Sequence, residues 1–479
     1  MTASKTYRTL SSLMNVCARD GDNLSWARLI SVLSTGKTFK SLSATIDFLS
    51  RMRTFHITPL DLMNGETYTS AFLKSYYSDD EIVVMSVETT GTSILNDDIV
   101  KVDAVKMRHG TPVGGSRLRL FLDTAVEIPE TLGGKLNPLF KEYAENKHLS
   151  REEGLGMLLR YICSDAVAGY NADIIVQTLR YNVVRSLQGF SADLATWNIG
   201  RLIRTVETRL PSYRLERVAK SLNIDCGEGD TLAALTAIAA HCAQKIEEKM
   251  PSQREQMATP EALSVKEALA KIEPLLSQMR RRLYDEVEPG SCFADDVSGV
   301  YTWMKEHSLV KTPLEELSDM LGMPFFEDDE TDDDDDDWTE PITATIDLII
   351  KYIRKEWKDN EPMTLYERLN KRASYLSTLS EADLINSKGL IKSQVFIMTI
   401  HKAKGLEFEN VVIPNVCDGI FPNHYSRTEK KKKEDARKLY VALTRATKRV
   451  CITYPEWIYT HHKSLSPFIE NIKGMFDRE

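Results

Sequence analysis

The stretch from Val395 to Pro414, VFIMTIHKAKGLEFENVVIP, constrains the fold of this chain more than any other. It begins with the apolar run 395–398 and ends with a second apolar run, 411–413. Short runs of this kind, rich in β-branched residues, predict buried strands of a parallel sheet. The residues between them are mostly polar. Because ligands of open α/β sheets gather at the carboxyl ends of strands, this polar segment is a candidate site.

A second block that also combines apolar and polar residues, Glu434–Tyr454 (EDARKLYVALTRATKRVCITY), follows. Its apolar residues recur at helical spacing between Ala436 and Ala446, which predicts a helix with one buried face. The run from Val450 to Tyr454 predicts another strand. Arg445 stands near the end of the predicted helix and just before this strand.

Together the two blocks resemble motifs V and VI of the UvrD/Rep family of superfamily 1 DNA helicases. The pattern T-x-H-x-A-K-G-L-E-F, and then an aromatic residue followed by Val-Ala-Leu-Thr-Arg-Ala, is matched nearly residue for residue, and 418–422 (DGIFP) also fits. The resemblance implies an α/β fold, namely the second RecA-like domain of a P-loop-NTPase type built on a parallel sheet. Without it, the residues would indicate a parallel-sheet domain that carries a basic helix.

The resemblance also implies roles for individual side chains. The family holds ATP between two RecA-like domains, so the resemblance makes Arg445 an arginine finger that stabilises charge on the transferred phosphoryl group. Gly405 and Glu407 would contact the nucleotide, whereas Thr399, His401 and Lys404 would face single-stranded DNA. Taken alone, Arg445 would be a surface arginine that pairs with the negative end of a helix. The basic run 430–433 is equally consistent with a solvated face or a contact to phosphates.

Length and composition limit the number of domains and the kinds of partner that the chain can have. A chain of 479 residues is expected to hold two or more domains. The net charge is -9, but the segment 327–337 holds ten acids, and removing them leaves -9 + 10 = +1. One solvated acidic loop therefore accounts for the acidity and does not argue against a basic groove elsewhere. No apolar run reaches 18 residues, so we expect a soluble cytoplasmic protein with no membrane partner.

The start of the chain suggests what it lacks. Residues 5–33 show two helical patterns separated by a polar break, as the resemblance implies just after motif IV. Gly36-Lys37-Thr38 imitates the end of a phosphate-binding P-loop, but Ser31 stands where that loop needs its first glycine. We therefore expect no first RecA-like domain in this chain, and no ATP or Mg²⁺ bound by the chain alone. That domain would come from upstream in cis or from another chain in trans.

Residues 81–230 have a different character. A strand pattern at 82–91 enters a glycine turn, a second strand pattern covers 99–107, and Ala166–Asp173 follows. These segments resemble the DEDD-type 3′→5′ exonuclease fold, which is ribonuclease-H-like, as in the proofreading subunit of bacterial polymerase III. That family holds two divalent metals with four carboxylates, because in-line attack on a phosphodiester needs both oxygens clamped.

Most of those carboxylates are missing here. The first motif becomes Ser86-Val87-Glu88, which retains only Glu88, and Ile175 occupies the position of the metal-binding Asp in the second motif. The third motif falls near Gly227 and Leu232, with Asp230 close by. Hard divalent ions need several oxygen ligands, so we predict a catalytically degenerate domain without metal. The alternatives are an active nuclease with rearranged ligands and, for Glu88 alone, a solvated carboxylate in a turn.

The predicted layout places the first part of the second RecA-like domain at 1–35 and the rest at 391–479. A helical accessory domain of the 2B type would cover 36–78 and 246–390, including the acidic loop, and an exonuclease-like insertion would cover 79–245. The leading hypothesis is the C-terminal part of an ATP-dependent 3′→5′ DNA helicase that acts in repair or replication on single-stranded or partly duplex DNA. A non-catalytic DNA-binding or docking module and an active 3′→5′ exonuclease are the alternatives.

Overall fold

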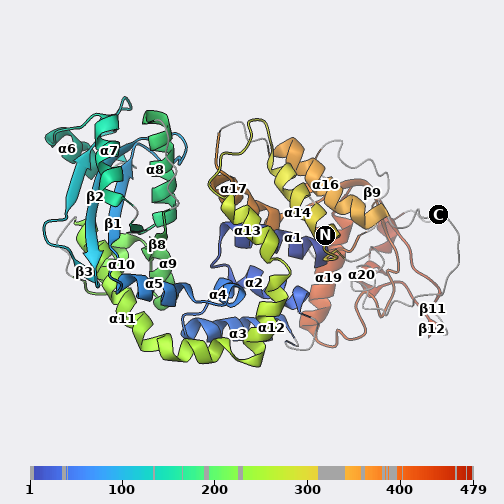
Figure 1. Cartoon of the computed structure of the whole chain (residues 1–479). Helices are drawn as coiled ribbons and strands as arrows, with labels where there is room; N and C mark the ends of the chain where they lie inside the picture. The colour runs from blue at the N-terminus through green and yellow to red at the C-terminus, as the bar shows by residue number, and fades with distance from the viewer. Residues whose placement is uncertain are drawn as a thin grey trace. The chain divides into compact units, whose positions relative to one another are not determined.

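The computed structural model of the chain (Figure 1) consists of two compact units. The larger unit holds 3–327 and 358–377, and the C-terminal unit holds 1–2, 328–357 and 378–479. The structure describes residues 5–34, 39, 41–132, 135–163, 165–187, 194–224, 230–310, 340–357, 362–379, 383–384, 387, 396, 398–401, 403–458, 461–470 and 472–476.

The larger unit combines many helices with a six-stranded mixed sheet and a separate two-stranded antiparallel sheet. Its helices are α1 (Lys5–Ala18), α2 (Asn23–Leu33), α3 (Leu42–Thr54), α4 (Pro59–Asn64), α5 (Tyr68–Tyr76), α6 (Pro138–Glu145), α7 (Arg151–Ile162), α8 (Ala172–Ser186), α9 (Ile199–Val206), α10 (Leu215–Ser221), α11 (Thr231–Met257), α12 (Pro260–Ala270), α13 (Glu273–Arg281), α14 (Phe293–Glu306) and, up to residue 377, α17 (Leu365–Thr378). Its strands are β1 (Ile82–Thr89), β2 (Ile99–Arg108), β3 (Thr111–Pro112), β4 (Leu118–Phe121), β5 (Thr131–Leu132), β6 (Lys135–Leu136), β7 (Ala166–Gly169) and β8 (Thr196–Asn198).

The sheet has the strand order β3-β2-β1-β7-β8, with β4 also paired to β2. β1 is antiparallel to β2 and parallel to β7, which is in turn parallel to β8. Because side chains alternate along a strand, Val83 and Met85 pack with α7 and α8, whereas Ile82 and Val84 pack with α5, α9, α10 and α11. Helices therefore cover both faces, and the carboxyl ends of β1 and β7 meet at one edge.

The first two helices confirm the helical patterns predicted for residues 5–33. The Asp22 side chain caps α2 by accepting a hydrogen bond of 3.1 Å from the Ser25 backbone N–H. The apolar residues that recur at helical spacing in these two helices are all buried: Leu10, Leu13, Met14, Cys17, Trp26, Leu29, Ile30 and Leu33. The described part of 246–390 is mostly helical, as its composition predicts.

The C-terminal unit carries the two motif blocks. Its elements are α16 (Glu340–Glu356), β9 (Phe408–Ile413), α19 (Glu429–Leu443), β10 (Ala446–Ile452), β11 (Trp457–Ile458), β12 (His461–His462), α20 (Pro467–Glu470) and the 3-10 helix η2 (Lys473–Met475). β9 and β10 are parallel neighbours, as the predicted parallel sheet requires. Leu439 and Ala442 of α19 pack in one cluster with Ile413.

Three details of the prediction are wrong in this unit. The helix ends at Leu443, not at Ala446, because pairing of Ala446 with Phe408 already belongs to the β9–β10 ladder. The following strand accordingly starts at Ala446. The prediction that the strands are buried is also wrong for β9, of which only Ile413 is buried, since α19 packs on one face. The run 395–398 lies partly outside the described residues, and Phe396 and Met398 have no regular secondary structure.

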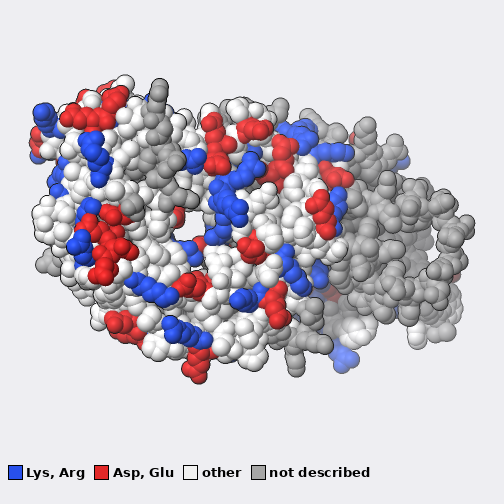
Figure 2. All heavy atoms as spheres, viewed as in Figure 1, with Lys and Arg blue, Asp and Glu red and all other residues white. Residues whose placement is uncertain are grey.

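Charged side chains of both signs are mixed over the face shown in Figure 2. The acidic segment 327–337 lies outside the described residues. Among the helices that the structure describes, none is both long enough and apolar enough to cross a membrane.

Candidate functional site

The motif V segment forms a tight series of turns before β9. The Ala403 N–H donates to the Thr399 carbonyl at 3.0 Å, and the Leu406 N–H donates to the Ala403 carbonyl at 3.1 Å. Ala403 and Leu406 are buried and anchor the turns, whereas Lys404 is exposed. The local sequence therefore presents its polar residues outward from two apolar anchors.

Gly405 is a residue that this turn requires. Its φ is +87°, in the left-handed region that side chains with a Cβ rarely adopt. No described atom lies within 4 Å of the position that a Cβ would take. Backbone conformation, and not the close approach of another part of the chain, therefore explains the glycine.

Arg445 joins the end of α19 to the motif V turn. Its NH1 group donates to the Leu406 carbonyl at 3.1 Å, and its Nε group donates to the Val441 carbonyl at 3.0 Å. Its NH2 group donates to Thr444 Oγ1 at 3.0 Å. The main chain closes the same junction, because the Phe408 N–H donates to the Arg445 carbonyl at 2.8 Å. The structure thus brings Arg445 next to the turn that carries Gly405 and Glu407, across 39 residues of sequence.

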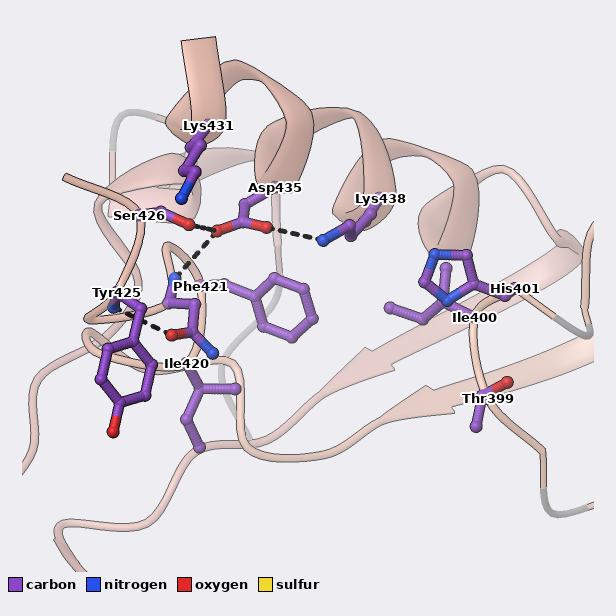
Figure 3. Close-up of a pocket in the computed structure, with 11 residues that line it drawn as sticks. Thr399, Ile400, His401, Ile420, Phe421, Tyr425, Ser426, Lys431, Asp435 and Lys438 are labelled. Carbon is purple, nitrogen blue, oxygen red and sulfur yellow. Dashed lines mark hydrogen bonds and ion pairs between the residues drawn. The ribbon is translucent and has the colours of Figure 1, made fainter. Parts of the chain in front are cut away.

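A pocket of about 430 Å³ lies between the motif V turn and α19 (Figure 3). Thr399 and His401 line it from the turn, and Lys431 and Lys438 line it from α19. In Figure 3, Tyr425 lies at the end of the pocket opposite Thr399 and His401. Of the predicted DNA-facing residues, Thr399 and His401 therefore share one pocket. Lys404 and the predicted nucleotide contacts Gly405, Glu407 and Arg445 are not among the residues that line it.

Asp435 is the residue of this pocket that the sequence reasoning missed. Its carboxylate accepts from Ser426 Oγ at 2.7 Å, from the Asn423 N–H at 3.0 Å and from Lys438 Nζ at 2.9 Å. Burial alone would raise the pKa of this carboxyl, but hydrogen bonds from Ser426, Lys438 and Asn423 prevail and lower it. Asp435 therefore fixes the loop before α19 onto the helix. The signal in the sequence was a single aspartate among the lysines of a basic helix.

Another pocket, of about 260 Å³, lies at the carboxyl ends of β1 and β7 in the larger unit. Ser86, Glu88, Asn171 and Ile175 are among the residues that line it. The pKa of the Glu88 carboxyl is raised, chiefly because neighbouring protein displaces water, although Lys101 opposes the shift. Glu88 lies in β1, near its end, so its placement in a turn is wrong, whereas the residue is exposed, as the interpretation as a solvated carboxylate requires.

Two carboxylates of the larger unit, Asp173 and Asp230, would be the substitutes for the missing ligands, but both are engaged elsewhere. Asp173 accepts hydrogen bonds from Thr196 at 2.5 Å and Asn198 at 3.4 Å. Asp230 caps α11 and forms an ion pair with Arg117 at 3.1 Å. Among the described residues, no group of three or more His, Cys, Asp or Glu side chains is placed to hold a metal ion. The side chains at this pocket therefore do not fit a pair of divalent metals.

These motifs, on a parallel strand pair covered by a helix, are those of a helicase C-terminal domain. The sequence model of the family described as UvrD-like helicase C-terminal domain matches residues 8–456, so the chain belongs to that family. It is 30% identical over 175 residues to a probable DNA helicase II homologue of Mycoplasma capricolum, a match that covers 35% of this chain and 23% of that protein. It is 46% identical over 66 residues to DNA helicase II of Haemophilus influenzae, covering 14% of this chain and 9% of that one. The matched segments thus span less than a quarter of each relative's length.

Solved structures give a weaker likeness. Exonuclease I from Methylocaldum szegediense is 20% identical to the aligned part, with a TM-score of 0.30, and covers 37% of this chain and 42% of that one. Escherichia coli exonuclease I in complex with a dT13 oligonucleotide is 15% identical, with a TM-score of 0.30, over 36% of this chain and 42% of that one. Similarity at this TM-score carries no conclusion about the insertion.

Proposed function

We propose that the chain forms the C-terminal half of the motor of an ATP-dependent 3′→5′ DNA helicase or translocase of DNA repair or replication. Arg445 would sense the γ-phosphate, and Gly405 and Glu407 would lie beside the nucleotide. Thr399, His401 and Lys404 would contact single-stranded DNA. ATP and Mg²⁺ would bind only together with a first RecA-like domain, supplied in cis or in trans.

The hydrogen bond between Arg445 NH1 and the Leu406 carbonyl carries this proposal. It attaches the arginine to the turn that holds Gly405 and Glu407, and the Ala403–Thr399 backbone bond attaches that turn to the DNA-facing residues. A change at the γ-phosphate would therefore be transmitted to the proposed DNA-contacting residues through groups that are hydrogen-bonded to one another. A guanidinium has five N–H groups, and these contacts use only three of them. The other two are available to a phosphate.

The test combines the purified chain with the first RecA-like domain and measures DNA-stimulated ATP hydrolysis. We expect no measurable turnover from the chain alone, because the phosphate-cradling loop would belong to the other domain. With both present, Arg445→Ala is expected to lower turnover by about 10³-fold while changing nucleotide affinity little. Arg445→Lys is expected to restore only part of it, because an ammonium cannot donate in several fixed directions.

Arg449→Ala is the matched control, because Arg449 is an exposed arginine four residues further on, in β10. It is expected to leave turnover unchanged. An equal loss of turnover and nucleotide affinity in Arg445→Ala would make the residue a simple ligand. DNA binding that does not respond to ATP in the completed protein would favour the non-catalytic docking module instead.

We also propose that the insertion is a degenerate ribonuclease-H-like exonuclease domain that serves as a spacer or docking surface. Its central β1, antiparallel to one neighbour and parallel to the other, supports this assignment. Ser86 and Ile175 at the pocket, where the related enzymes have metal-binding carboxylates, support the loss of activity. The predicted layout of the accessory domain and the two RecA-like segments belongs to the same proposal.

A further inference from the structure

A cleft of about 600 Å³ in the larger unit is lined by five arginines: Arg19, Arg53, Arg201, Arg204 and Arg280. The lining residues include two aspartates, Asp20 and Asp173, and no lysine or glutamate, so they sum to 5 - 2 = +3. The whole chain carries -9. Figure 2 shows basic side chains gathered beside the hollow in this unit. A protein that is acidic overall thus concentrates guanidinium groups, which match phosphate geometry best, in one place.

Several of these arginines are held in position by their neighbours. The Arg201 guanidinium lies 4.0 Å from the centre of the Tyr68 ring and 3.4 Å from the Asp20 carboxylate. Arg204 donates to the Gly200 carbonyl at 2.7 Å and lies over the Tyr213 ring. These contacts leave other N–H groups of each guanidinium unused, so the arginines are oriented without being saturated.

Arg280 adds an enclosed cation with a free donor to the cleft. Its Nε atom is buried and has no hydrogen-bond partner among the described residues. Burial lowers the pKa of the guanidinium, Asp20 raises it and the nearby Arg201 lowers it further. An enclosed cation next to a second cation is costly unless a counter-charge joins them. A phosphate oxygen in the cleft would supply both the charge and the missing acceptor.

Aromatic rings add a second kind of contact. Tyr213, Tyr284 and Tyr366 line the same cleft, and the rings of Tyr284 and Tyr366 are 5.4 Å apart at an angle of 35°. Flat rings next to guanidinium groups form the usual surface for an unpaired strand, because bases stack while phosphates are neutralised. An inorganic anion would use only the arginines.

We propose that this cleft binds a segment of single-stranded DNA, with phosphates on Arg280, Arg19 and Arg201 and bases against Tyr284 and Tyr366. The cleft would be a second site of contact with single-stranded DNA, in a different unit from Thr399 and His401. Binding of DNA there would need no nucleotide. It goes beyond the proposed motor function and can be tested without it.

The experiment measures binding of a fluorescent oligothymidine to the full chain by anisotropy, without ATP and at several salt concentrations. Arg280→Gln and Arg19→Gln are each expected to weaken binding about tenfold and to reduce the slope of log affinity against log salt by about 1. Arg281→Gln is the matched control, because Arg281 is the exposed next residue on α13 and does not line the cleft. It is expected to change neither quantity.

A stability measurement separates loss of the site from loss of the fold. The oligonucleotide is expected to raise the Tm of the wild type and of Arg281→Gln, but to raise that of Arg280→Gln much less. Without DNA, Arg280→Gln is expected to be no less stable than the wild type, since it removes an unpaired enclosed charge. An Arg280→Gln variant that binds the oligonucleotide as tightly as the wild type would overturn the proposal.

Two further arms identify the source of the phosphate. An abasic oligonucleotide of equal length is expected to bind more weakly, and Tyr366→Leu is expected to remove that difference. Pyrophosphate is expected to give little stabilisation. If pyrophosphate stabilises the chain as much as the oligonucleotide, the cleft is a site for small phosphate compounds and the proposal of a DNA strand is wrong. These measurements use no ATP, whereas the motor proposal is tested by DNA-stimulated ATP hydrolysis, so failure here and failure of the motor proposal are distinguishable.

Discussion

Single residues of this chain show how the same side-chain type takes different roles according to enclosure. Arg445 is half-buried and bonded to two carbonyls, whereas Arg280 has a buried Nε without a described partner. Histidines differ in the same way. His56 is buried with an unpartnered Nδ1 atom, whereas His109 is exposed, and both have positive φ.

His56 predicts an acid-sensitive contribution to stability. Burial, with help from Lys249, lowers the pKa of its imidazole from 6.5 to about 4. The unfolded chain therefore binds a proton at His56 between these values while the folded chain does not, so stability falls as the pH is lowered through that window. Asparagine tolerates positive φ and carries no imidazole. We therefore expect the free energy of unfolding of His56→Asn to fall by roughly 1–3 kcal/mol less than that of the wild type between pH 7 and pH 4.

Urea unfolding at several pH values measures this difference. His109→Asn is the matched control, since that histidine also has positive φ but is exposed, so the variant shows what the same substitution does outside the core. Parallel profiles for the wild type and His56→Asn would show that His56 does not stay neutral in the folded protein.

At the scale of elements, the motif V turn and α19 form a single structural piece. The Arg445 side chain joins the end of α19 to Leu406 in the turn, and the β9–β10 ladder joins the strands that follow the turn and the helix. Asp435 joins α19 to the preceding loop through Ser426 and Asn423. The pocket between them is therefore shaped by contacts that bridge separate stretches of chain.

Gly405→Ala is expected to strain this piece. At φ +87° an added Cβ costs about 1–2 kcal/mol, and the turn would shift away from the Leu406–Arg445 bond. We expect a lower Tm and, in the completed motor, a fall in DNA-stimulated ATP hydrolysis. Gly474→Ala is the control, because it also has open space around it but no positive φ. Equal behaviour of the two variants would mean that the turn does not need the left-handed conformation.

At the scale of the whole molecule, two pockets of the larger unit adjoin, because Asn171 and Ile174 line both. One is the pocket with Glu88, and the other is the arginine cleft. A strand bound in the cleft would therefore lie close to Glu88, which makes a nuclease test informative.

We predict no degradation of 3′-labelled single-stranded DNA by the full chain in Mg²⁺ or Mn²⁺, because Ser86 and Ile175 cannot neutralise a divalent ion. Gel analysis of the labelled strand checks this directly. The full chain carrying Glu88→Ala is the control for contaminating nucleases, whose products would persist in that variant. Digestion that disappears with Glu88→Ala would contradict the prediction and would require Asp173 or Asp230 to leave their present partners.

Local patterns in the sequence determined the helices at 5–33, the strands that begin at Ile82 and Ile99, and the family. These features depend on residues close together in the chain, where periodicity and capping act. The end of α19 was predicted three residues too late, because local propensity does not register that Ala446 pairs with Phe408. Cross-strand pairing is a tertiary contact, and here it outweighs the local preference for a helix.

Only the tertiary structure decided which distant side chains meet. The bond from Arg445 to the Leu406 carbonyl spans 39 residues, and the arginine cleft gathers residues between Arg19 and Arg280. No local pattern marks those arginines, because only Arg201 and Arg204 share a helix, α9, and they meet Arg19, Arg53 and Arg280 only after the helices pack. Likewise, Asp230 lies close to the third motif in the sequence, but the folded chain engages it in an ion pair with Arg117. Packing fixes the directions of side chains, and site chemistry depends on those directions.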